Sequence, residues 1–182
     1  EQYVSTIRAS VEQAGAQLVA EIEGARPNAP REDLARITEE LTRANPDVII
    51  SFGGGSTIDA AKAAEVLRTL GGGIEDYFGV GLVTKKLGET GKTLTPHIAI
   101  QTAASSGAHL TKYSNITDIS TGQKKLIVDE AIVPTHPVFD YTVTHSAPPS
   151  LTSDGALDGI AHILEVFYGA VGKPYYDKLR EI

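Results

Sequence analysis

The sequence of 182 residues contains no cysteine, no methionine and no tryptophan. The lack of cysteine excludes disulfides, thiolate metal sites and a cysteine nucleophile, so a metal ion would have to be held by His and carboxylate side chains. Because methionine is absent even at position 1, we expect the natural start to lie upstream or the chain to be incomplete. No apolar stretch approaches the roughly 20 residues that a bilayer span requires, so we expect no membrane segment.

The chain also lacks an excess of basic residues. It has 16 Lys and Arg against 23 Asp and Glu, a formal charge of -7, and no basic run interleaved with aromatics, which argues against nucleic acid as a partner. The first residues lack the basic and apolar regions of a signal peptide, so we expect a cytoplasmic protein. With 41% hydrophobic residues and 18 glycines, the composition is typical of a folded globular chain.

Helices and strands alternate in the predicted pattern. Apolar residues at helical spacing predict helices, and near-continuous apolar runs predict strands. The predicted helices cover residues 4–14, 34–41, 57–70 and 151–170, and the predicted strands cover residues 17–22, 47–52, 97–100, 113–117 and 124–128. Residues 118–122 are expected to form a hairpin turn, and residues 80–95 an exposed loop. The alternation predicts an α/β fold with a largely parallel sheet.

A break in this pattern falls at Pro148-Pro149-Ser150. Two prolines followed by a long periodic helix predict a domain boundary near Pro148. No linker here is long enough to make the boundary flexible, so we expect the two parts of the chain to pack together.

A glycine loop, Gly53-Gly54-Gly55-Ser56, lies between a predicted buried strand and a predicted helix. Bare backbone can approach a phosphate closely, the helix N-terminus carries partial positive charge, and Ser56 can cap the helix or donate to a phosphate oxygen. A tight strand-to-helix turn is the alternative, and a glycine run by itself favours it.

With Asp59 and Lys62 the loop becomes Gly-Gly-Gly-Ser-x-x-Asp-x-Ala-Lys, which resembles the iron-containing alcohol dehydrogenase family. The resemblance implies that Gly54, Gly55 and Ser56 carry the pyrophosphate of a nicotinamide cofactor and that Asp59 lies near it. From the residues alone, Asp59 and Lys62 could equally be ordinary first-turn and solvent-facing charges.

A second loop, residues 101–111, follows a predicted buried strand and is rich in small hydroxyl residues. Its sequence, Gln-Thr-Ala-Ala-Ser-Ser-Gly-Ala-His-Leu-Thr, resembles the family form Pro-Thr-Thr-Ala-Gly-Thr-Gly-Ser-Glu-Val-Thr. The resemblance implies that Thr102 and Ser106 contact the cofactor. Ala103 replaces a Thr that usually touches the cofactor, and Gln101 and His109 stand where Pro and Glu are usual.

Two further residues of this region can be explained without a functional role. Lys124 falls where the family has a Lys that reaches the cofactor, whereas its position alone favours a solvated hairpin charge. His109 is given no role, because a loop histidine bonded to backbone is the commoner arrangement.

Asp158 and His162 lie four residues apart on the predicted helix after Pro148. This spacing places Cβ atoms about 5–6 Å apart on one helix face, so a carboxylate oxygen and an imidazole nitrogen can converge on one cation. A helix-surface Asp–His hydrogen bond is the alternative. The family helix Gly-Met-Asp-Ala-Leu-Thr-His-Ala-Ile-Glu is similar, and it implies that Asp158 and His162 are the first two ligands of an Asp-His-His-His site for Fe(II) or Zn(II).

The other two histidines of that site would lie beyond Ile182, so we expect the 182-residue chain alone to bind metal weakly or not at all and to be inactive. The resemblance implies a Rossmann-like dinucleotide-binding domain over residues 1–147, without its first strand. The first helices of an all-helical metal-binding domain would follow over residues 148–182, in a dehydroquinate synthase-like architecture.

The implied function is metal-dependent transfer of hydride between an alcohol, or the matching aldehyde or ketone, and NAD or NADP, in a homodimer or higher homo-oligomer. Within the superfamily, a glycerol dehydrogenase, a hydroxyacid-oxoacid transhydrogenase or a maleylacetate reductase remains an alternative. Two alternatives lie outside this superfamily. One is a nucleotide-binding protein without redox activity. The other is a structural scaffold whose apolar surface around Leu164, Val166 and Phe167 would be covered by the missing half of the protein.

Overall fold

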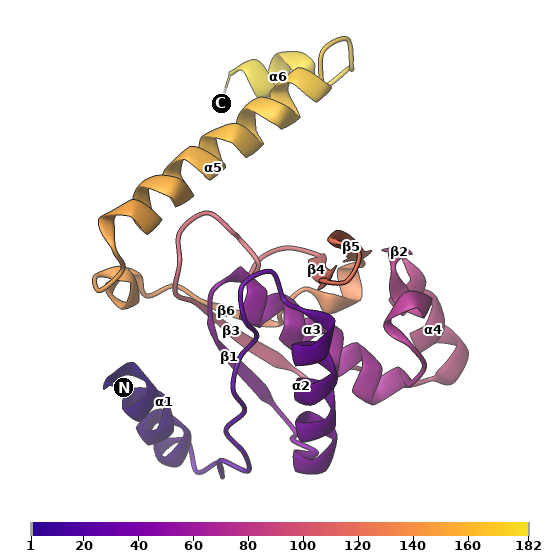
Figure 1. Ribbon diagram of the computed structural model, residues 1–182, viewed down its shortest axis with the longest axis vertical. Coiled ribbons are helices and arrows are strands. Elements are labelled where there is room, and N and C mark those ends of the chain that lie inside the picture. The colour runs from indigo at the N-terminus through magenta and orange to yellow at the C-terminus, as the bar shows by residue number, and fades with distance from the viewer. Residues whose placement is uncertain (1, 182) are drawn as a thin grey trace.

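The computed structural model describes residues 2–181, and it is an α/β body from which one long helix projects (Figure 1). Its centre is a parallel sheet with strand order β1-β3-β6, formed by Ile49–Gly53, His97–Gln101 and His136–Val138. The register places Ile50 opposite Ile98 and Ile98 opposite His136. Parallel strands need crossover connections, and helices supply the one between β1 and β3.

A second, smaller sheet has the order β2-β5-β4. Strands β4 (Tyr113–Asp118) and β5 (Gln123–Val128) form the predicted antiparallel hairpin, and β2 (Gly79–Val80) pairs parallel to β5. The hairpin is an excursion from the parallel sheet, as the sequence predicts.

Helices complete the body. The α-helices are α1 (Gln2–Gln13), α2 (Arg31–Ala44), α3 (Gly55–Leu70), α4 (Leu82–Thr90), α5 (Pro149–Gly169) and α6 (Tyr176–Arg180). The short 3-10 helices are η1 (Ile74–Tyr77), η2 (Glu130–Ile132) and η3 (Tyr141–Thr144). Helix α3 contacts α2, β1 and β4, so it joins both sheets.

The core gathers around α3. Its alanines at positions 60, 63 and 64 have no exposed surface, and such small side chains let neighbouring elements approach closely. Helix α2 adds Leu34, Ile37 and Leu41, and the small sheet adds the fully buried Ile116 and Ile127. The dehydration of this apolar surface is the main stabilising term of the fold.

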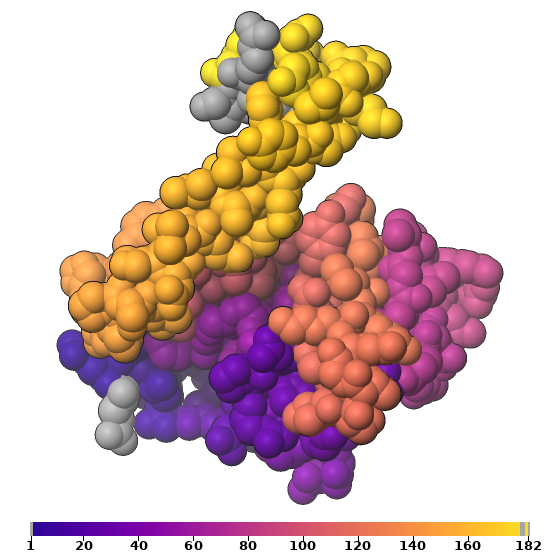
Figure 2. All heavy atoms as spheres, turned by 45° about the horizontal axis from the view of Figure 1, so that its top comes forward, coloured from indigo at the N-terminus to yellow at the C-terminus, as the bar shows by residue number. Residues whose placement is uncertain are grey.

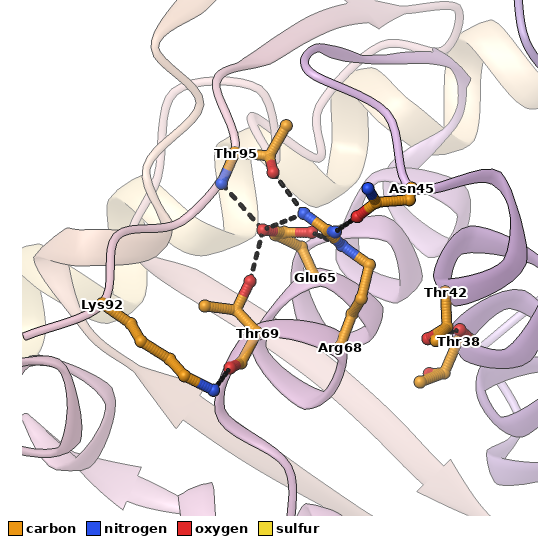
Figure 3. Close-up of polar contacts among 8 residues, drawn as sticks. All are labelled: Thr38, Thr42, Asn45, Glu65, Arg68, Thr69, Lys92 and Thr95. Atoms are coloured by element: carbon orange, nitrogen blue, oxygen red, sulfur yellow. Dashed lines mark hydrogen bonds and ion pairs between the residues drawn. The ribbon is translucent and has the colours of Figure 1, made fainter. Parts of the chain in front are cut away.

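Four charged residues, Asp59, Lys62, Glu65 and Arg68, form what we call the charged stripe of α3. A step of three residues falls about 60° short of a full helical turn, so the stripe winds around the helix. Asp59 and Lys62 contact β4, whereas Glu65 and Arg68 contact Thr95. At its end, Glu65 accepts hydrogen bonds from Thr95 N and Thr69 Oγ1, each at 2.7 Å, and Arg68 pairs with Glu65 (Figure 3). Arg68 also reaches Asn45 Oδ1 at 3.0 Å. These pairings satisfy charges that would otherwise be costly to bury.

The predicted strand at residues 17–22 is wrong. Residues 16–26 have no regular secondary structure, and Leu18 and Val19 are exposed. Within residues 2–181, no strand pairs with this segment, and an apolar run whose backbone groups lack a neighbouring strand does not form one.

The predicted exposed loop at residues 80–95 is also wrong, because α4 occupies most of it. Val83 is fully buried and Leu87 packs against the core four residues later, so one face of α4 is apolar. Gly81 and Gly91, which suggest a loop in the sequence, are instead the two caps of the helix, with φ of 73° and 67°. Left-handed backbone of this kind favours glycine.

The remaining predicted elements are confirmed. The helix around residues 34–41 ends at Ala44, where Asn45 adopts a left-handed C-cap, and α3 begins two residues before its predicted start. Strand β6 was not predicted, since it is only three residues long and contains Pro137. The last long helix, α5, matches its predicted span closely.

Helix α5 projects from the body, and Figure 2 shows it crossing above the remaining surface. None of its residues is buried, so the expectation that the two parts pack together is wrong for most of the helix. Leu164 and Val166 are exposed as predicted, whereas Phe167 is half-buried against the rings of Tyr168 and Tyr176. Among the described helices, none has the length and apolar character needed to cross a membrane.

Candidate functional site

The glycine loop connects the end of β1 to the start of α3, with Gly54 at the N-cap. Two of its positions leave no room for a side chain. A Cβ on Gly53 would lie 2.7 Å from Thr57 Cβ, and a Cβ on Gly55 would lie 2.9 Å from Ser106 Cβ. Close packing against the second loop therefore requires glycine at position 55.

A cavity of about 240 Å³ opens at the N-terminus of α3. It is lined by Asn28, Gly55, Ser56, Asp59, Asn115 and Lys124. The first backbone N–H groups of a helix have no partner within the helix and carry partial positive charge, which suits an anionic ligand. The exposed Lys124 adds a full positive charge, so the rim of the cavity is suited to a phosphate group.

Four of the residues predicted to bind a cofactor therefore share one cavity: Gly55, Ser56, Asp59 and Lys124. Gly54, Thr102 and Ser106 do not line it. Thr102 N donates to Gly53 O at 2.9 Å, and Ser106 packs against Gly55. Both residues therefore contact the glycine loop itself and not the cavity.

Asp59 faces β4 as well as the cavity. Its Oδ2 accepts hydrogen bonds from Asn115 N at 3.0 Å and Asn115 Nδ2 at 3.3 Å. Burial raises the pKa of Asp59, while the bonds from Asn115 and the nearby Lys62 oppose that rise. The interpretation of Asp59 as an ordinary first-turn charge is wrong, because the residue is buried beyond the first turn.

Lys62 is not solvent-facing either, since only 2% of it is exposed. Its Nζ donates to Thr111 O at 2.7 Å and to Tyr113 O at 2.9 Å. Burial lowers the pKa of Lys62 to about 8, against the opposing influence of Asp59. Lys62 thus ties α3 to the end of the second loop and the start of β4.

The second loop contains two buried polar atoms without a partner among the described residues, Gln101 Oε1 and His109 Nδ1. Gln101 Nε2 donates to Ala103 O at 2.8 Å and to Ser106 Oγ at 2.7 Å. His109 lies edge-on to Phe139, with ring centroids 5.1 Å apart, and burial lowers its pKa. The expected bond from His109 to backbone is therefore not formed at Nδ1.

Asp158 and His162 lie on one face of α5, with Asp158 Oδ2 3.7 Å from His162 Nδ1. That separation exceeds a hydrogen bond, so the alternative of a direct Asp–His hydrogen bond is wrong. Instead, Ser105 Oγ donates to Asp158 Oδ2 at 2.6 Å. An oxygen and a nitrogen donor at this separation fit part of the coordination shell of Fe(II) or Zn(II).

The pair does not make a complete site on its own. Within the part of the chain that the structure describes, no group of three or more His, Asp or Glu could hold a metal ion. The side chains of Asp158 and His162 are 54% and 59% exposed, respectively. Whether the 182 residues bind a metal ion therefore stays a prediction.

The second loop touches both candidate sites. Ser106 packs against Gly55 in the glycine loop, and the adjacent Ser105 bonds to Asp158 on α5. Gly155 of α5 also lies against Ala104. One short loop therefore connects the cofactor cavity to the candidate metal ligands.

Sequence reasoning missed two residues of the cavity, Asn28 and Asn115. Asn28 N donates to Ser56 Oγ at 2.9 Å, and Asn28 has φ of 69°. The Pro-Asn-Ala-Pro segment signals a turn, which this φ bears out, but nothing in the sequence places that turn beside α3. Asn115 offered no signal apart from its place in a strand.

The parallel sheet, the helical crossover and the glycine loop at a strand-to-helix junction define a Rossmann-like α/β fold. Comparison with known proteins agrees. The model of the family described as iron-containing alcohol dehydrogenase matches residues 1–141. The chain belongs to the iron-containing alcohol dehydrogenase family.

Several individual proteins are similar to this chain. The sulfoacetaldehyde reductase of Bilophila wadsworthia is 34% identical over 148 residues, which cover 81% of this chain and 36% of that protein. The NADPH-dependent butanol dehydrogenase of Clostridium saccharobutylicum is 30% identical over 182 residues, covering 97% of this chain and 44% of that protein. The chain thus spans less than half the length of these relatives.

Solved structures show the same fold. The alcohol dehydrogenase from Oenococcus oeni superposes with a TM-score of 0.78 at 27% identity, covering 88% of this chain and 40% of that one. The NADH-dependent butanol dehydrogenase A from Thermotoga maritima gives a TM-score of 0.77 at 25% identity, covering 89% of this chain and 39% of that one.

Proposed function

We propose that the full-length protein is a metal-dependent oxidoreductase that transfers hydride between an alcohol, or the matching aldehyde or ketone, and NAD or NADP. The observation that carries the proposal is the cavity at the N-terminus of α3, where Gly55, Ser56 and Lys124 meet. Backbone N–H groups, a hydroxyl and an ammonium at one helix N-terminus are the groups that bind a pyrophosphate. Family membership supplies the reaction class.

In this proposal the cofactor is held by residues 1–147, acting as the dinucleotide-binding domain. Gly54, Gly55 and Ser56 carry the pyrophosphate, Lys124 neutralises it, and Asp59 lies beside it. Thr102 and Ser106 hold the second loop against the glycine loop, which fixes the distance between them. Both cofactors remain candidates, because the relatives include an NAD-dependent methanol dehydrogenase from Bacillus methanolicus and an NADPH-dependent butanol dehydrogenase.

Residues 148–182 would begin the metal-binding domain, with Asp158 and His162 as two of the ligands of Fe(II) or Zn(II). A metal bound there would polarise the substrate oxygen, and the nicotinamide would exchange hydride with the substrate carbon. The remaining ligands would come from parts of the full-length protein outside these residues. Asp158 and His162 present their oxygen and nitrogen atoms on the same helix face, which supports this assignment.

The substrate class follows from the relatives. Their names specify sulfoacetaldehyde, methanol and butanol, so we propose a small alcohol or carbonyl compound as the substrate. We also propose a cytoplasmic homodimer or higher homo-oligomer, by likeness to the family.

The test measures metal content and nicotinamide-dependent alcohol oxidation on the full-length protein, for wild type and His162→Ala. We expect about one Fe or Zn per chain in wild type, and loss of both metal and activity in the variant. Nicotinamide binding, followed by quenching of intrinsic tyrosine fluorescence, should be kept, since His162 lies outside the cofactor cavity.

His145→Ala is the matched control, because His145 is an exposed histidine that precedes α5. It should retain both metal and activity. A metal-free wild type that is inactive on simple alcohols and aldehydes yet binds the nucleotide would favour the second candidate, a nucleotide-binding protein without redox activity. The lack of a third metal ligand among the described residues is what keeps that candidate open.

A further inference from the structure

Ser105 has an unusual backbone conformation. Its φ is +80°, in the left-handed region that glycine enters freely and other residues enter at a cost in free energy. In the family form of this loop the corresponding residue is Gly. This chain therefore keeps a side chain at a position where the backbone favours none, and such an outlier calls for a compensating contact.

The compensating contact is made by the hydroxyl. Ser105 Oγ donates to Asp158 Oδ2 at 2.6 Å, across 53 residues of sequence. This length is typical of a hydrogen bond from a hydroxyl to an ionised carboxylate, which is stronger than one between neutral groups. Helix α5 has few other contacts with the body, so this bond holds Asp158 at a defined place beside the second loop.

We infer that Ser105 is a positioning residue for the metal site, which fixes the carboxylate of Asp158 so that it faces the cation together with His162. The inference rests on the proposed function, because only there does Asp158 act as a metal ligand. A carboxylate offers about four lone-pair positions, so Asp158 can accept the Ser105 hydroxyl and still bind a metal. Hydrogen bonds that orient metal ligands commonly change metal affinity by about 10–100-fold.

The same bond links the metal ligand to the cofactor cavity. Ser106, the next residue, packs against Gly55 at the N-terminus of α3. The segment that carries Ser105 therefore lies against the glycine loop, where the proposed cofactor would bind. Ser105 thus sets the position of the metal ligand relative to the nicotinamide cofactor.

The experiment is a titration of the metal-free, full-length protein with Co(II), which accepts the same oxygen and nitrogen donors as Fe(II) and Zn(II) and can be followed by visible absorption. The variants are Ser105→Ala and Ser105→Gly. Both remove the hydroxyl, but only Gly also removes the backbone strain. We expect both to weaken Co(II) binding by about tenfold, at the lower end of the range because the Asp–His pair is more than half exposed.

The Co(II) absorption bands should also change in both variants, because the carboxylate is free to reorient. A purely structural role of Ser105 would not alter these bands. Ser153→Ala serves as the control, since Ser153 is an exposed serine on α5, and it should bind Co(II) as wild type does.

Two results would overturn the inference. One is wild-type Co(II) affinity and bands in both Ser105 variants. The other is weaker binding in Ser105→Ala but not in Ser105→Gly, since that would assign the effect to loop strain. Asp158→Ala separates this failure from that of the proposed function: if it binds Co(II) as tightly as wild type, Asp158 is not a ligand and the metal site itself is wrong.

Discussion

His97 lies inside the parallel sheet with its Nε2 2.7 Å from the hydroxyl of Ser51 on the neighbouring strand. Its backbone is fixed as well, because His97 N donates to Thr135 Oγ1 at 2.9 Å. Burial, together with the nearby Lys62 and against the opposing influence of Glu65, lowers the pKa of His97 to about 4. The imidazole is therefore neutral in the folded protein under ordinary conditions.

This lowered pKa predicts a loss of stability in mild acid. Between about pH 6.5 and pH 4 the unfolded chain binds a proton at His97 and the folded protein does not, so the free energy of unfolding falls as the pH falls through that window. Between pH 7 and pH 4.5, wild type should lose about 2 kcal/mol more than His97→Gln in urea denaturation. The exposed His136 offers a control, and His136→Gln should follow wild type. Parallel curves for wild type and His97→Gln would contradict the prediction.

At the N-terminus of α3, the glycine loop packs closely against the second loop, residues 101–111. Gly55→Ala would place a Cβ 2.9 Å from Ser106 Cβ, so the second loop would have to move. We expect a loss of about 1–3 kcal/mol in the free energy of unfolding, as for other overpacked sites.

Gly88→Ala in α4 provides the opposite case. Gly88 lies in an exposed part of the helix, with nothing within 4 Å of an added Cβ. This substitution should stabilise the protein by about 0.5–1 kcal/mol, since alanine loses less backbone freedom on folding. Thermal unfolding of both variants tests the pair of predictions, and shifts of the same sign would count against the packing described for Gly55.

The charged stripe of α3 leads to a second prediction, on the stability of the fold. Glu65→Ala would leave the guanidinium of Arg68 largely buried without its partner and Thr95 N without an acceptor (Figure 3). Removing one member of a buried pair commonly costs about 3–5 kcal/mol, so urea denaturation should show a loss of that order.

The control for Glu65 is an ion pair on the surface. Glu39 and Arg43 lie on α2 with their charges 3.5 Å apart and their side chains 74% and 69% exposed. Glu39→Ala should change stability by less than about 0.5 kcal/mol. Equal losses in the free energy of unfolding for Glu65→Ala and Glu39→Ala would contradict the prediction, because the buried contacts of Glu65 would then stabilise the fold no more than a surface ion pair does.

At the scale of the whole molecule, the exposed apolar side of α5 should govern how residues 1–182 behave when expressed alone. Leu157 and Ile163 are 65% and 69% exposed. We expect concentration-dependent association in light scattering and strong binding of a hydrophobic dye. The double variant Leu157→Gln/Ile163→Gln should reduce both, whereas Glu165→Gln, a polar change on the same helix, should not. Unchanged association in the double variant would place the contact elsewhere.

Much of the body could be predicted from the sequence, because β1, α3 and β3 carry clear apolar periodicity and the glycine loop marks their junction. The sequence does not predict helix α4, because its two capping glycines resemble loop signals. The strand predicted over residues 17–22 is wrong, because an apolar run carries no information about a pairing partner. For the site, the sequence predicts Gly55, Ser56, Asp59 and Lys124 as cofactor contacts; the four share one cavity, and their role in binding stays a prediction. It could not identify Asn28, Asn115 or the Ser105–Asp158 contact, since these depend on distances between remote segments.

The charged stripe of α3 also constrains the order in which the chain can fold during synthesis. Asp59, Lys62 and Glu65 find their partners at residues 115, 111–113 and 95, all of which leave the ribosome later than α3 itself. Until then α3 would have to bury unpaired charges, which is strongly unfavourable. We therefore expect α3 to settle fully on the sheet only after residue 115 has left the ribosome.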